Sequence, residues 1–193
     1  SLCNSENQTP LQIAIKYWNI ETFIAILDLY GDNVINHKSE LDNLIQITLE
    51  KSINLHYKMR NQFEEALCRI LDIKNINPNL IYKNTSFLIY ACDNNREHIC
   101  EKLLSLDNID PNIRVPSNGK TPLIISISSY NTQYFNTTNI SKLLINHPKI
   151  DLSIKDNNGK NAIDTAIYYN RIEIIKVLAD KGIPDAMNAY GNI

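Results

Sequence analysis

The sequence predicts an all-α solenoid of about five stacked helix-turn-helix units. A capping residue followed by a short apolar helix recurs along the chain, and a second apolar segment follows about seventeen residues after the caps Thr9, Ser86 and Asn161, and about five residues later than that after Thr121. Short polar loops that contain Asn, Asp or Gly separate these helix pairs. A repeat of this length is typical of solenoids, in which neighbouring units share one continuous core.

The clearest helix start is the stretch Gly119–Ile127. Thr121 suits the N-cap because its hydroxyl can accept a hydrogen bond from an otherwise unpaired amide of the first turn. Pro122 suits the first helical position because its missing N–H costs nothing there. Similar starts stand at Thr9, Ser86 and Asn161, and each precedes an apolar run. We interpret these starts as structural elements of the repeat.

A second amphipathic segment follows most of these starts. It ends in an apolar pair at Ile26-Leu27, Leu103-Leu104 and Leu178-Ala179. The apolar spacing is that of a helix with one buried face. One helix pair cannot bury such a face alone, so the units are expected to stack.

The loops complete the pattern. Asn75–Asn79, Asn108–Asn112 and Lys149–Ser153 each follow a second helix. With the Thr-Pro-Leu helix starts, they make the chain resemble the ankyrin-repeat family over nearly its whole length. The resemblance implies one ankyrin-repeat domain over 1–193 with short hairpin-like loops. Its units would span approximately 1–35, 36–82, 83–117, 118–157 and 158–193.

The first unit is expected to have helices at about Pro10–Trp18 and Glu21–Leu29, with Gly31 as the C-cap. We interpret Trp18 as a cover for the N-terminal end of the stack, with a partner contact as the alternative.

The second unit is irregular. Ser39–Asp42 reads as a capping box, but the apolar pair of the second helix, Ile70-Leu71, comes about thirty residues later. The extra residues, 48–61, contain neither Gly nor Pro. We expect them to lengthen both helices; an exposed insertion loop is the alternative.

The last three units are the most regular. In the third, Leu88, Ala91 and Cys92 are expected to point inward. The fourth unit carries a polar insertion at 128–138. We expect the aromatic residues of this insertion to fold back onto the unit, with contact to a partner as the alternative. The tail 183–193 either caps the stack or begins another unit.

The composition is that of an ordinary folded protein. The 193 residues carry a net charge of −2, with 44% hydrophobic and 21% charged residues. No Lys/Arg cluster points to nucleic acid, and no apolar run reaches the length of about 18 residues that a membrane span needs.

Four cysteines, Cys3, Cys68, Cys92 and Cys100, lack metal-ligand spacing. We expect Cys68, Cys92 and Cys100 to be small buried thiols, which favours a reducing, cytoplasmic location.

The sequence predicts no enzyme and no cofactor. It contains no Gly-rich phosphate loop, no Gly-x-Ser-x-Gly and no His-Glu-x-x-His motif. The adjacent acids Glu64 and Glu65 suit a solvated helix face. The sequence therefore places function at exposed positions.

The resemblance implies a scaffold that binds a partner protein through a concave groove and the loops between repeats. In the family, the turns between units and the ends of the first helices commonly contact partners, and tyrosine is enriched in binding hot spots. Ser129 and Tyr90 belong to the same predicted surface. The candidate residues are Lys16, Tyr17, Tyr82, Lys83, Asp93, Asn94, Arg114, Asn118, Lys120, Tyr130, Asn158, Lys160, Tyr168 and Tyr169.

Two alternatives remain open from the sequence. The chain could be a recruitment domain of a larger protein whose activity lies elsewhere. It could also hold a small molecule or nucleic acid in its groove, with Arg114, Lys120 and Lys160 as the basic residues. We expect a monomer, with self-association through 48–61 as an alternative. Partner and pathway are not encoded in any motif.

Overall fold

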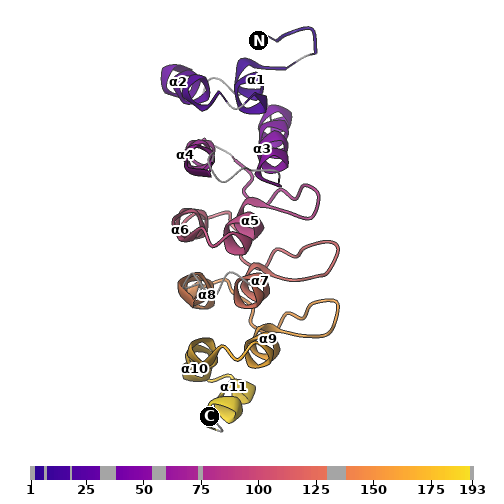
Figure 1. Ribbon diagram of the computed structural model, residues 1–193, viewed down its shortest axis with the longest axis vertical. Helices are drawn as coiled ribbons and strands as arrows, with labels where there is room; N and C mark the ends of the chain where they lie inside the picture. Colours follow the sequence, from indigo (N-terminus) through magenta and orange to yellow (C-terminus); the bar gives the residue numbers. More distant parts are fainter. Residues whose placement is uncertain are drawn as a thin grey trace. The chain divides into compact units, whose positions relative to one another are not determined.

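A computed structural model describes residues 3–6, 8–17, 19–30, 38–53, 60–73, 76–129 and 138–191. The chain divides into two compact units, Ser1–Ser86 and Phe87–Ile193, and each is described by itself. The regular secondary structure of these residues is helical (Figure 1). One isolated bridge joins Tyr82 to Thr85. The predicted all-α class is confirmed.

The first compact unit contains two helix pairs. The helices are α1 (Pro10–Lys16), α2 (Ile20–Tyr30), α3 (Lys38–Ile53) and α4 (Arg60–Leu71). Helix α1 packs against α2 and α3, and α2 packs against α4. The predicted start of α1 is confirmed: the Thr9 side chain accepts from the Gln12 amide, and the Gln12 side chain accepts from the Thr9 amide.

The irregular second pair contains one clearly lengthened helix of the two that the sequence predicts. Helix α3 has 16 residues, against 7 in the other first helix, α1, whereas α4 has 12, against 11 in the other second helix, α2. Within the extension, Thr48 and Leu49 are fully buried, so Leu49 packs into this unit's own core. Ser39 lies inside α3, one residue after its start, which corrects its predicted place at the cap. Trp18, Gly31 and 54–59 lie outside the described residues.

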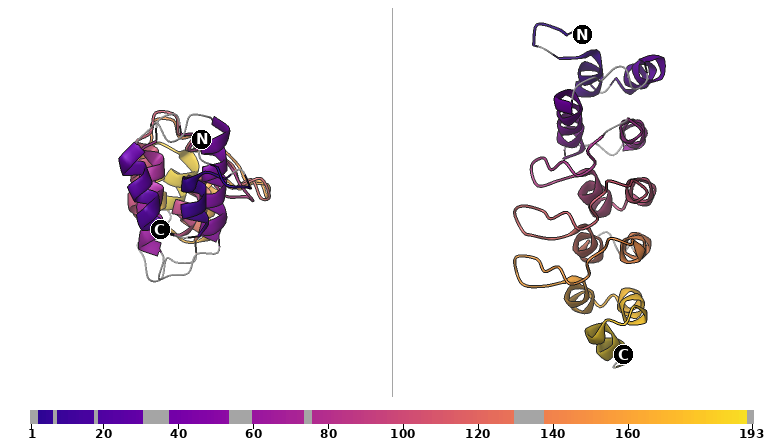
Figure 2. Two further views of the ribbon diagram at one scale, coloured as in Figure 1. Left: turned by 90° about the horizontal axis from the view of Figure 1, so that it is seen from above. Right: turned by 180° about the vertical axis from the view of Figure 1, so that it is seen from behind.

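The second compact unit has seven helices within its described residues. They are α5 (Phe87–Asp93), α6 (Glu97–Leu104), α7 (Pro122–Ser128), α8 (Thr138–Asn146), α9 (Ala162–Tyr168), α10 (Ile172–Asp180) and α11 (Pro184–Gly191). The first helices α5, α7 and α9 form one layer, and α6, α8 and α10 form the other (Figures 1 and 2). Helix α11 packs against α9 and α10.

Local capping explains where the first helices begin. The Thr121 hydroxyl oxygen accepts from the Ile124 amide at 3.3 Å, and Pro122 occupies the first helical position. Asn161 and Asp164 form a reciprocal capping box, with both bonds at 3.0 Å. The inward residues predicted for α5, namely Leu88, Ala91 and Cys92, are buried. Residues 130–137 of the insertion lie outside the described part of the chain.

Hairpin-like loops precede α7 and α9, as predicted. The Val115 amide donates to the Lys120 carbonyl at 2.9 Å, and the Asp156 amide donates to the Lys160 carbonyl at 2.8 Å. Gly119 and Gly159 turn the chain with φ of +70° and +76°, a conformation that glycine adopts without steric cost. The two loops are joined because the Asn157 amide donates to the Asn118 carbonyl at 2.9 Å.

Two of the four cysteines face each other inside the second unit. Cys92 in α5 and Cys100 in α6 are fully buried, with their Sγ atoms 3.9 Å apart. Burial, followed by the hydrogen bond between the two thiols, raises the pKa of the Cys92 thiol. The predicted burial is thus confirmed for both, whereas Cys68 is only half-buried.

We expect iodoacetamide to alkylate Cys92 and Cys100 at least about 100-fold more slowly than Cys3 at pH 8. The reagent needs an accessible thiolate. Burial opposes access to both thiols, and it also raises the pKa of Cys92, which opposes ionisation there. Time-resolved mass spectrometry of tryptic peptides would measure each rate. Equal rates at Cys92 and Cys3 in the folded protein would contradict the buried placement.

A search of the described helices for a membrane span finds none that is both long enough and apolar enough.

Candidate functional site

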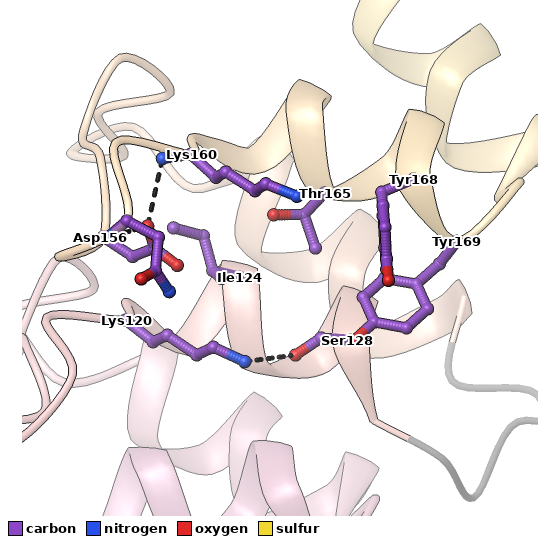
Figure 3. Close-up of a pocket in the computed structure, with 9 residues that line it drawn as sticks. Lys120, Ile124, Ser128, Asp156, Lys160, Thr165, Tyr168 and Tyr169 are labelled. Atoms are coloured by element: carbon purple, nitrogen blue, oxygen red, sulfur yellow. Dashed lines mark hydrogen bonds between the residues drawn. The ribbon is translucent and has the colours of Figure 1, made fainter.

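The best-defined candidate site is a pocket in the second compact unit between α7, α9 and the loops that lead into them. Its volume is about 260 Å³. Figure 3 shows the side chains converging from two consecutive repeats. The lining residues are Lys120, Ile124, Ser128, Asp156, Asn158, Lys160, Thr165, Tyr168 and Tyr169.

Two lysines enter this pocket from equivalent places in the repeat. Lys120 immediately precedes the cap of α7, and Lys160 immediately precedes the cap of α9. The Lys120 ammonium donates to the Ser128 hydroxyl at 3.3 Å. The Lys160 Nζ lies 4.2 Å from the centroid of the Tyr168 ring. Both side chains run along their helices in the same direction (Figure 3), so the two positive charges lie in one pocket.

A pair of tyrosines at the end of α9 forms another part of the wall. The rings of Tyr168 and Tyr169 meet edge to face, with centroids 5.0 Å apart. The Arg171 guanidinium lies 5.9 Å from the Tyr169 ring and donates to the carbonyls of Ile127 and Ser129. Arg171 therefore connects the end of α9 to the end of α7. Tyr168 remains 69% exposed, so its ring is available to a partner.

The one acidic residue of the pocket has its own local partners. Asp156 is buried, and its Oδ1 accepts from the amides of Asn158 at 2.8 Å and Lys160 at 3.0 Å. Within the described part of the chain, no carboxylate lies within ion-pair distance, 4.0 Å, of the Lys120 or Lys160 ammonium. The pocket can therefore offer two ammonium groups beside aromatic and hydroxyl groups.

The structure brings five of the sequence-predicted candidates together in this pocket: Lys120, Asn158, Lys160, Tyr168 and Tyr169. Four others in the same compact unit lie outside its lining: Asp93, Asn94, Arg114 and Asn118. Tyr130 lies outside the described residues. Lys16, Tyr17, Tyr82 and Lys83 belong to the first compact unit.

Two of the four outlying candidates hold the loops. Arg114 donates to the carbonyls of Gly119 and Lys155, both at 3.1 Å, and so joins two successive loops. The Asn118 side chain accepts from the Lys120 amide at 2.9 Å. These contacts position the loop that carries Lys120.

The candidates in the first compact unit also pair lysine with tyrosine. Tyr17 is 71% exposed, and the Lys16 Nζ lies 5.7 Å from its ring centroid. Lys83 lies 5.0 Å from the Tyr82 ring and 3.6 Å from Glu50. Hydrogen bonding to Tyr82 is the main cause that raises the pKa of Lys83, with Glu50 adding to it.

Two residues assigned to the predicted binding surface are buried instead. Tyr90 is 6% exposed within α5, because its side chain packs in the core. Ser129 is 8% exposed, and its hydroxyl donates to the Asp93 carbonyl at 3.5 Å. Neither side chain is presented to a partner.

The other four lining residues divide into two groups. Asp156 begins the turn 156–160, which the sequence places at the exposed surface, but its side chain is buried. Sequence reasoning missed Ile124, Ser128 and Thr165. Ser128 could have been found by aligning the helix caps Thr121 and Asn161, since this alignment places Ser128 at the position of Tyr168. Ile124 and Thr165 are almost fully buried, and no sequence signal separates them from core residues.

A second, shallower hollow of about 550 Å³ lies beside α6 and α8. Its lysine, Lys142, is paired with Glu173 at 3.3 Å, and its acid, Glu97, accepts from Asn139. This hollow therefore offers less unpaired charge than the first pocket. Among the described residues, no group of three His, Cys, Asp or Glu side chains is placed to bind a metal ion.

Comparison with known proteins adds two findings. A sequence model described as "Ankyrin repeats (3 copies)" matches residues 88–188, just over half of the chain. The chain is also similar to a solved structure of the ankyrin repeat domain of Bcl-3, described as a unique member of the IkappaB protein family. That similarity has 14% identity and a TM-score of 0.49, and covers 91% of this chain and 86% of the other. No curated protein matches the chain.

Proposed function

The chain belongs to the ankyrin-repeat family, and from this premise we propose that it binds a partner protein through the first-helix layer and loops of its second compact unit. Ankyrin repeats are generally protein-interaction modules and typically carry no enzymatic activity. The repeat itself supports the stack, so partner choice depends on the side chains presented at exposed positions.

The observation that carries this proposal is the exposed Tyr168 at the edge of a pocket built by two repeats. Its ring is fixed from two sides, by Lys160 at 4.2 Å and by the Tyr169 ring at 5.0 Å. A pre-positioned aromatic side chain loses little conformational freedom on binding, which is why tyrosine is frequent in hot spots. Arg171 and the joined loops hold the surrounding backbone.

We expect Tyr168→Ala to weaken partner binding by about tenfold or more, because truncation of a central aromatic contact commonly costs that much. The full chain and the variant would be immobilised side by side and exposed to a lysate of the source cells. Quantitative mass spectrometry would identify the proteins recovered by each, and titration with the purified partner would measure both affinities.

Tyr190→Ala is the matched control, because Tyr190 is 40% exposed on α11 and does not line the pocket. It should recover the same proteins as the unmodified chain. Both variants should keep their melting temperature within about 2 °C, since exposed substitutions are nearly neutral for stability. Equal recovery by the Tyr168 variant would contradict binding at this surface.

A further inference from the structure

We infer that the pocket recognises a carboxylate side chain, Asp or Glu, of an acidic peptide segment in the partner protein. The inference rests on the proposed protein-binding function and specifies its chemistry. The residues that carry it are Lys120 and Lys160, with Ser128 and Tyr168 beside them.

Charge is the first argument. The lining contains two lysines and one aspartate, and the aspartate Oδ1 already accepts from two loop amides. The lysine ammonium groups instead contact a hydroxyl and an aromatic ring. Neither contact neutralises a positive charge, and with the Asp156 carboxylate the lining keeps a net charge of +1. An incoming carboxylate would therefore meet an excess of positive charge and would displace no existing ion pair.

The second argument concerns which anion fits. Phosphate is commonly bound by several backbone N–H groups of a loop that point at one site. In the loop 156–160, the amides of Asn158 and Lys160 donate to the loop's own Asp156. The Ser128 and Thr165 hydroxyls donate to the carbonyls of Ile125 and Asn161, so the charged donors of the pocket are the two lysine ammonium groups. This set favours a carboxylate, which needs fewer donors than a phosphate.

The third argument is that the pocket suits a side chain of a longer chain. Its volume of about 260 Å³ is below the range of about 300 to 1,000 Å³ that is usual for sites enclosing an organic ligand. Ile124 and the two tyrosine rings offer apolar contact to the methylene stem of a Glu. The exposed Tyr168 lies at the edge, where the neighbouring residues of a peptide would pass.

The test is a selection of random 12-residue peptides displayed on phage, run in parallel on three forms of the full chain. These are the unmodified protein, the variant Lys120→Glu/Lys160→Glu and the single variant Lys176→Glu. Lys176 is exposed on α10, in the other helix layer, so its reversal changes charge outside the pocket. Circular dichroism would verify that all three are folded.

We expect the unmodified protein and Lys176→Glu to select peptides that share an Asp or Glu at one position. The double variant should lose these peptides and favour Lys or Arg there. In solution, replacing the selected acid by Gln should weaken binding by about tenfold, and raising NaCl from 50 to 500 mM should weaken the Glu peptide more than the Gln peptide.

Four outcomes would overturn the inference. Selection of no peptide, or of the same peptides by the double variant, would remove the lysines from recognition. Tighter binding of a phosphoserine peptide than of the Glu peptide would assign the pocket to phosphate. Selected peptides that lack an acid but still depend on Tyr168 would reject the carboxylate while leaving the protein-binding function intact.

Discussion

Leu144→Ala is expected to lower the free energy of unfolding by about 3 kcal/mol, because it removes a fully buried side chain and leaves a cavity. Helix α8, which carries Leu144, packs against α6, α7 and α10. In a solenoid, a residue of an inner unit contributes to its own helix pair and to two neighbouring interfaces. Urea denaturation followed by circular dichroism would measure the loss.

The next residue provides a matched control. Leu143 is only half-buried and faces the shallow hollow beside α6 and α8. The same truncation there should cost less than about 1 kcal/mol, since little apolar area returns to water. Equal losses for Leu143→Ala and Leu144→Ala would contradict the assigned inward face of α8.

Gly119→Ala is expected to cost about 2 to 3 kcal/mol, and Gly159→Ala about 1 to 2 kcal/mol. Both glycines have φ near +70°, at +70° and +76°, so both variants should pay about 1 to 2 kcal/mol for a left-handed backbone. Only at Gly119 would the new Cβ meet other groups, at 2.3 Å from Asn157 Oδ1 and 2.6 Å from Arg114 Nη2.

The additional cost at Gly119 comes from hydrogen bonds between the two loops. Arg114 and Asn157 would have to move away, which breaks their bonds to the carbonyls of Lys155 and Ser117. One lost bond of this kind costs about 1 kcal/mol. Thermal unfolding of both variants would measure the difference. A larger loss for Gly159→Ala would reject the steric argument, because nothing lies within 4 Å of a Cβ there.

These glycines also connect stability to the candidate site. Gly119 directly precedes Lys120, and Gly159 directly precedes Lys160, so each turn sets the direction of a pocket lysine. A variant at Gly119 should therefore disturb the loop pair that supports the pocket as well as the fold.

The helices are readable from the sequence because their determinants are local. The caps at Thr9, Thr121 and Asn161 act within three residues, and the apolar spacing identifies the buried face without knowledge of any neighbour. The lengthened α3 is predictable for the same reason, since nothing in its sequence breaks a helix. The resemblance to the ankyrin-repeat family rests on these same local features.

The pocket is only partly readable from the sequence. Lys120, Lys160 and Tyr168 lie at expected surface positions, but their convergence depends on how α7 packs beside α9. Tyr90 shows the opposite error: the sequence assigns it to the binding surface, but it lies in the middle of α5 and its side chain is buried. Its burial depends on which neighbours fill the space around α5.

The helical repeat, the helix starts and the lack of recognisable catalytic motifs can be read from the amino-acid sequence alone, because each depends on residues close together in the chain. The pocket that Lys120 and Ser128 share with Lys160 and Tyr168 becomes visible in the folded protein. The same is true of Asp156, whose carboxylate accepts from the amides of its own loop. Side chains from successive repeats meet through helix packing and hydrogen bonds between loops, which no local pattern encodes.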